Sequence, residues 1–127
     1  MEYMDNNQFN LIRNNDAMII KVIFSHDYAV IDIETWDNKN YEINCSSIHG
    51  IKNNANLEVE IGDIIFSRET DFFCETAKAL FGGVENVPAS VRSMIICEAY
   101  DNTPILEVVA ESFELTRQEN SSCDVTV

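Results

Sequence analysis

Apolar and polar residues alternate over most of this sequence, and that period of two limits its fold more than any other feature. Val, Ile, Tyr and Phe are frequent in the alternating segments, and short turns rich in Asp, Asn and Ser separate them. Short turns imply antiparallel neighbours. We therefore predict about six strands, over residues 17–24, 28–36, 41–48, 56–66, 91–100 and 105–116.

The segment 71–81 changes to a period of about 3.6 residues, which is typical of an α-helix. Thr70 and Asp71 are suitable N-caps, and Gly82-Gly83 is a suitable end. Four apolar residues gather on one side: Phe73, Ala77, Leu80 and Phe81. We predict an α+β fold, in which one principal helix over about 70–82 covers an open side of a curved, mainly antiparallel sheet. This arrangement would bury Phe73, Leu80 and Phe81.

The chain has 127 residues, of which 46% are hydrophobic, and this predicts a single domain over 1–127. We expect residues 1–15 to form a docking arm and residues 118–127 to form a flexible polar tail. The glycine and asparagines within 49–55 predict a loop there. Gly62 interrupts an alternating segment, which predicts a bulge or bend.

Acidic residues outnumber basic ones by 22 to 8, which gives a formal net charge of −14. Several fall one residue apart in predicted strands, where alternation would place them on one face of the sheet. The predicted partner-binding residues are Asp32, Glu34, Glu42, Glu58 and Glu60, with Trp36 in register as an aromatic anchor. Such a face repels nucleic acid and acidic membranes and attracts a basic protein. Two alternatives stay open: a solvated outer face, and Trp36 packed over the hairpin edge at Tyr41.

The four cysteines, Cys45, Cys74, Cys97 and Cys123, are widely spaced and form no CxxC pair. Structural zinc sites usually bring their ligands in close pairs, so we expect free thiols and no bound metal. The first residues show neither a basic region nor an apolar core of the kind found in signal peptides, and no apolar run is long enough to cross a bilayer. A cytoplasmic protein is therefore expected.

Candidate catalytic groups are few. His26-Asp27 beside Ser25 resembles part of a hydrolytic triad, but no nucleophile-elbow motif surrounds the serine. Glu58 and Glu60 project side by side, as paired carboxylates do in acid–base catalysis, yet no pocket signature accompanies them. Gly82-Gly83 lacks the spacing of a phosphate-binding loop. We expect no catalytic site and no cofactor.

Four stretches resemble the pattern of small bacterial immunity proteins, which protect cells against polymorphic toxins, including contact-dependent growth-inhibition toxins. The matching stretches are 15–24, 30–37, 41–45 and 106–114. The family pattern starts with His-Asp-Ala, and Asn15 stands at the position of the histidine. The resemblance implies a non-enzymatic cytosolic protein that binds a toxin domain and blocks its active site or an adjacent exosite.

Three functions follow from these observations. The first is an immunity protein that neutralises a cognate basic toxin domain, in particular a nuclease, by masking its substrate-binding surface with carboxylates. The alternative is a phage-encoded inhibitor that mimics the charge of nucleic acid against a host defence protein. A small hydrolase that uses His26 and a serine comes third.

Overall fold

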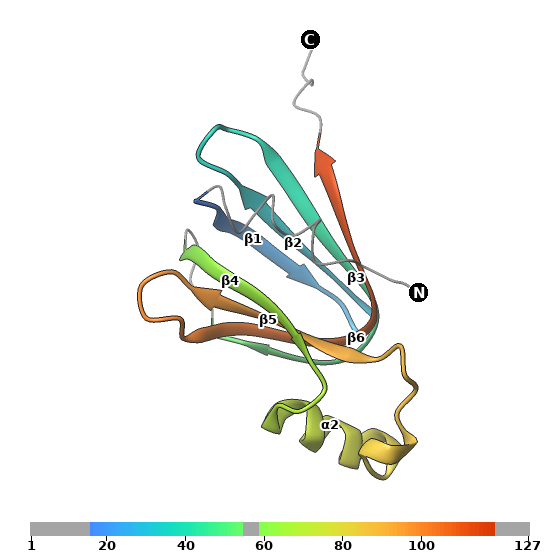
Figure 1. Ribbon diagram of the computed structural model, residues 1–127. Helices are drawn as coiled ribbons and strands as arrows, with labels where there is room; N and C mark the ends of the chain where they lie inside the picture. The colour runs from blue at the N-terminus through green and yellow to red at the C-terminus, as the bar shows by residue number, and fades with distance from the viewer. Residues whose placement is uncertain (1–15, 55–58, 119–127) are drawn as a thin grey trace.

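The computed structural model of the chain describes residues 16–54 and 59–118. Its elements follow one another as strands, a helix, a short 3-10 helix and two further strands (Figure 1). They are β1 (Met18–Phe24), β2 (Tyr28–Glu34), β3 (Asn40–Asn53), β4 (Val59–Ser67), α2 (Asp71–Phe81), η1 (Val84–Asn86), β5 (Arg92–Glu98) and β6 (Pro104–Gln118). The predictions of an arm at 1–15 and a tail beyond 118 lie outside the described residues.

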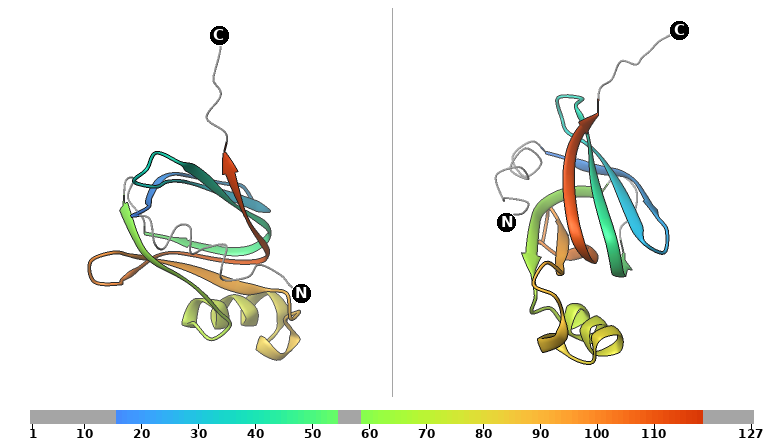
Figure 2. Two further views of the ribbon diagram at one scale, coloured as in Figure 1. Left: turned by 45° about the horizontal axis from the view of Figure 1, so that its top comes forward. Right: turned by 90° about the vertical axis from the view of Figure 1, so that its right-hand side faces the viewer.

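The six strands form a closed antiparallel barrel in the order β1-β2-β3-β6-β5-β4 (Figure 2). The barrel closes where β1 pairs with β4, through Met18 opposite Glu60 and Ile19 opposite Val59. The α+β class, the antiparallel strands and the principal helix are confirmed. The sheet is more closed than the open, curved sheet expected from the sequence, because β1 and β4 also pair with each other.

Alternating side chains of all six strands fill the barrel interior. The largest fully buried residues there are Ile19, Ile31, Ile33, Ile43, Ile64, Met94, Ile96 and Leu106. Residues at odd positions of β2, and of β3 as far as Cys45, point inward, so the even positions there, including Asp32 and Glu42, lie on the outer surface. The predicted alternation thus fixes which face of each strand is available to a partner.

The predicted loop at 49–55 is wrong for residues 49–53, because β3 continues to Asn53 and stays paired with β6. A bulge between Ile48 and Gly50 lets the strand bend. A Cβ atom at Gly50 would lie 3.1 Å from the Phe72 ring, so the glycine allows α2 to approach β3 closely. The bulge predicted at Gly62 is confirmed by a register shift between Ile61 and Asp63.

The helix α2 packs against the outside of the barrel, beside β6 and β3 (Figures 1 and 2). At its start the Thr70 hydroxyl accepts a hydrogen bond from the Phe73 amide, and at its end Gly82 adopts a left-handed conformation. A second apolar cluster joins the helix to the barrel and contains Phe73, Ala77, Val87, Val91 and Val109. Phe73 is buried as predicted and Phe81 is half-buried.

The prediction that Leu80 is buried is wrong, since 57% of this residue is exposed. The second cluster contacts α2 through Phe73 and Ala77, with Phe72 and Phe81 packed against it, and does not include Leu80 near the end of the helix. Two strand ends also differ from prediction: β2 ends at Glu34 and β5 at Glu98. In each case the chain enters a hydrogen-bonded turn. After β2 the Thr35 amide donates to the Lys39 carbonyl, and after β5 the Asn102 amide donates to the Glu98 carbonyl.

Candidate protein-binding face

Asp32 and Glu42 stand directly opposite each other on the outer surface, one on β2 and one on β3. Both are half-buried among neighbouring side chains. Directly opposed residues on antiparallel strands have Cβ atoms about 4.5–5.5 Å apart, and like charges at this separation are destabilising. The pair is therefore a locally unfavourable arrangement held in place by the barrel.

Two neighbours partly offset this repulsion. Lys21 on β1 places its Nζ 3.8 Å from Asp32 Oδ2, and Asn44 Nδ2 donates to Glu42 Oε1 at 3.4 Å. Among the described residues, Lys21 is the lysine that pairs with Asp32. Its ammonium is largely solvent-exposed, so the attraction it provides is modest.

Glu34 and Glu60 extend the negative surface towards β4. Met18 on β1 pairs with Glu34 on one side and with Glu60 on the other, so the three residues form a row across three strands. The two carboxylates are thus separated by two strand spacings, roughly 10 Å at the backbone. We call Asp32, Glu34, Glu42 and Glu60 the acidic face. Glu58, predicted to belong with them, lies outside the described residues.

Trp36 does not continue β2 in register with Asp32, because the strand ends at Glu34. It lies instead in the turn between β2 and β3, which Asn38 closes with a left-handed backbone, φ 66°. The residue is 68% exposed, whereas Tyr41 is buried in the barrel. The indole is therefore available to a partner at the end of the acidic face and is not packed on Tyr41.

The same turn holds Asp37 as a carboxylate. Thr35 Oγ1 donates a hydrogen bond to Asp37, and Lys39 Nζ lies 3.5 Å from Asp37 Oδ2. The hydrogen bond from Thr35, aided by the Lys39 charge, lowers the pKa of Asp37. Trp36 is thus followed by a further negative charge that sequence analysis did not include in the site.

Sequence analysis also missed the apolar part of this surface. Ile23 on β1 pairs with Val30 on β2, and Tyr28 lies at the start of the same strand. Ile23, Phe24 and Tyr28 are each exposed. Ile23 and Tyr28 lie on the outer side of the strands, opposite Val30 and Ser46, whereas Phe24 follows Ile23 directly and pairs with the buried Ala29. The prediction from the sequence considered only the carboxylates of this surface. Carboxylates beside exposed aromatic and aliphatic groups make a surface suited to protein binding.

The remaining candidate groups lie elsewhere. His26 is exposed in the β1–β2 turn, with Nδ1 3.5 Å from Ser25 Oγ and Nε2 4.0 Å from Asp27 Oδ2. His49 is half-buried, lies edge-on to Phe81 and has Nε2 3.8 Å from Glu111 Oε2. His26 therefore sits exposed on this turn, beside the half-buried Ser25.

Cys45, Cys74 and Cys97 are free thiols, and Cys123 lies outside the described residues. Burial raises the pKa of Cys45 to about 12, and burial together with Asp63 raises the pKa of Cys97. Within residues 16–54 and 59–118, no group of three or more His, Cys, Asp or Glu side chains is arranged to hold a metal ion.

No family model, curated protein or solved structure matches this chain. In the part of the chain that the structure describes, no helix has the length and apolar character required to cross a membrane.

Proposed function

We propose that this chain is a non-enzymatic immunity protein that acts in the cytoplasm and neutralises a cognate basic toxin domain. The observation that carries the proposal is the acidic face, on which Asp32 and Glu42 oppose each other while Glu34 and Glu60 extend the same surface. Trp36 stands exposed at its end and would supply an aromatic anchor. A nuclease is the favoured toxin class, because its substrate-binding surface must be basic.

The carboxylates of the acidic face are charges that the fold holds in place before a partner binds. The strands of a closed barrel hold these carboxylates in fixed positions, so little conformational freedom is lost when a partner binds. A basic surface would relieve the repulsion between Asp32 and Glu42 that the free protein bears. The net charge of −14 would also accelerate the encounter with a cationic protein.

The proposal is tested by co-expression with the product of the adjacent toxin-like reading frame in the source genome. We expect that product to arrest growth alone and this chain to restore growth. The double variant Asp32→Asn, Glu42→Gln should lose most of the protection, because it removes two charges from the acidic face while keeping side-chain shape. The matched control is Glu75→Gln, Glu85→Gln, which removes two exposed charges from α2 and η1.

Protection by the control variant but not by the acidic-face variant supports the proposal. Equal protection by both variants would place the interface elsewhere. Absence of any protection by the wild-type chain, in a cell where the neighbouring product is toxic, would remove the immunity function itself.

A further inference from the structure

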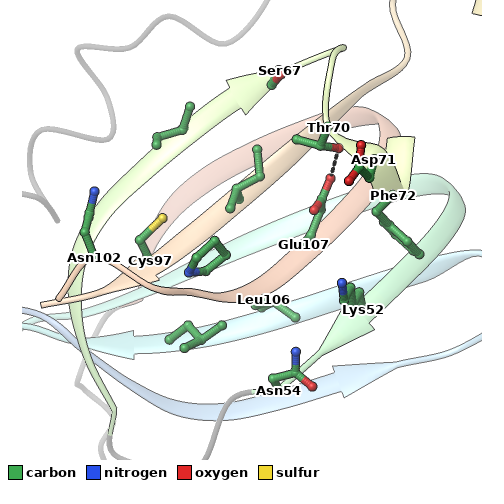
Figure 3. A pocket seen from close by; sticks show the side chains of 14 residues that line it. Lys52, Asn54, Ser67, Thr70, Asp71, Phe72, Cys97, Asn102, Leu106 and Glu107 are labelled. Carbon is green, nitrogen blue, oxygen red and sulfur yellow. Dashed lines mark hydrogen bonds between the residues drawn. The ribbon is translucent and has the colours of Figure 1, made fainter. Parts of the chain in front are cut away.

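A groove of about 590 Å³ lies between the start of α2 and the strands β3, β4, β5 and β6 (Figure 3). Its apolar walls include Ile65, Ile95, Phe72 and Pro104. Ile65 is 40% exposed, so apolar surface is open to whatever enters. The volume falls within the range of roughly 300–1,000 Å³ that is typical of ligand sites and exceeds that of one side chain.

A carboxylate lies in this groove on β6. Glu107 is only 8% exposed, and Figure 3 shows it directed towards Thr70 and Asp71. Thr70 Oγ1 donates a hydrogen bond to Glu107 Oε2 at 2.5 Å and accepts one from the Phe73 amide. Among the described residues, the hydrogen bonds of this carboxylate reach Thr70 alone and leave Oε1 without a donor.

Among residues 16–54 and 59–118, no lysine or arginine forms an ion pair with this carboxylate. Lys52 is its direct cross-strand neighbour on β3 and lines the groove, but no ion pair joins the two within the described residues. Asp71 lines the groove as a second acidic residue and is exposed. A nearly buried carboxylate without an ion pair is electrostatically costly, and the nearby Lys52 and the N-terminus of α2 offset only part of that cost.

We infer that this groove receives an arginine side chain of the basic protein partner. The inference rests on the proposed function and names a second contact of the same complex. The guanidinium would donate to Glu107 Oε1, with Asp71 as a further acceptor, while its aliphatic stem packs on Ile65 and Ile95. A guanidinium is more weakly hydrated than an ammonium and donates in a planar fork, so arginine fits an apolar-walled carboxylate site better than lysine does.

The test is an NMR titration of the isotope-labelled full chain with the peptide acetyl-Gly-Arg-Gly-amide. The control peptide carries citrulline in place of arginine, which keeps the shape and removes the charge. We expect the arginine peptide to shift the amide signals of Thr70, Phe72 and Glu107. The citrulline peptide should bind about tenfold more weakly, because it lacks the charge-assisted hydrogen bonds.

Two variants should change the affinity for the arginine peptide in opposite directions. Glu107→Gln keeps an acceptor for Thr70 and should weaken binding of the arginine peptide about tenfold. Lys52→Gln removes a positive charge from the groove and should strengthen binding about twofold or more. A purely structural role of Glu107 would not make these two substitutions act in opposite directions on the same peptide.

The inference is overturned if both peptides bind equally, if Glu107→Gln binds the arginine peptide as well as wild type, or if the signals that move belong only to the acidic face. Failure of the two proposals can be told apart. Asp32→Asn, Glu42→Gln should leave peptide binding in the groove unchanged while protection against the toxin is lost, whereas Glu107→Gln alone should lose the peptide response.

Discussion

Glu42 is expected to favour binding of a basic partner at the expense of stability. Its carboxylate faces that of Asp32, and the only cation recorded near the pair within the described residues is Lys21, 3.8 Å from Asp32. Replacing Glu42 with Gln keeps the hydrogen bond from Asn44 and removes the repulsion. We expect the free energy of unfolding in urea to rise by about 0.2–1 kcal/mol.

The same variant should bind the basic partner less tightly, so stability and affinity should move in opposite directions. The matched control is Glu75→Gln, an exposed helical position, for which both quantities should stay close to wild type. A fall in stability of Glu42→Gln would show that the carboxylate serves the fold and is not a strained binding group.

Cys45 gives the protein a specific sensitivity to alkaline conditions. Burial raises the pKa of its thiol to about 12, whereas the pKa in the unfolded chain is close to the ordinary value of 9.0. The thiol is therefore protonated in both states below pH 9, and above that pH the unfolded state alone ionises. Stability is lost as the pH rises from about 9 towards about 12, by roughly 1.4 kcal/mol per pH unit.

Urea unfolding of wild type and Cys45→Ala at pH 8 and pH 10.5 measures this effect. We expect the wild type to lose about 2 kcal/mol more than the variant over this interval, since only the wild type carries the buried thiol. Equal losses would mean that other groups cause the alkaline sensitivity.

At the scale of elements, α2 is attached to the barrel through the second apolar cluster. Phe73 is 1% exposed within the second apolar cluster, while Leu80 on the same helix is 57% exposed. Phe73→Ala should lower the free energy of unfolding by about 3–5 kcal/mol, and Leu80→Ala should change it by less than about 0.5 kcal/mol. Chemical denaturation of the two variants, which differ little in helix propensity, checks this. Comparable losses would mean that Leu80 is covered in solution.

Local sequence patterns predicted most of the strands and the helix. The features that they did not predict depend on pairing between strands that are far apart in the sequence. Alternation in β2 and β3 correctly predicted which residues face outward, and the change of period at residue 71 predicted α2. Residues 49–55 were predicted to form a loop because they contain a glycine and two asparagines, although residues as far as Asn53 continue to pair with β6. Closure of the barrel depends on β1 meeting β4 across about 40 residues of chain, for which no short pattern exists.

The candidate sites also divide into one that local sequence patterns predicted and one that depends on long-range pairing. The acidic face was predictable because its members lie at alternating positions of neighbouring strands, whereas Trp36 was misplaced because the strand end could not be located to within two residues. The groove around Glu107 was not predictable. Its lining residues come from β3, β4, α2, β5 and β6, and only the folded barrel brings them together.

At the scale of the whole molecule, the net charge of −14 predicts association that depends strongly on salt. The Debye length falls from about 10 Å at 0.1 M to about 3 Å at 1 M, so the association rate with the basic toxin domain should fall at least tenfold over that range.

Trp36→Ala should instead raise the dissociation rate, by the factor that corresponds to a loss of binding free energy on the order of 2 kcal/mol for a central anchor. Surface plasmon resonance at several salt concentrations separates the two effects. Salt-independent association would leave the charge as a feature of solubility.

The length of β3 has a consequence for the shape of any partner. This strand carries Glu42 near one end and Lys52 near the other, so a single continuous element joins the acidic face to the groove. Ten residues of extended chain span at most roughly 33 Å, which is close to the width of a standard interface of about 800 Å² per partner. Because β3 bends at its bulge between Ile48 and Gly50, a toxin domain that engages both ends must follow this bend around the barrel, with its arginine at most about one interface width from its basic surface. A shorter partner would occupy one end and leave the other free for a second molecule.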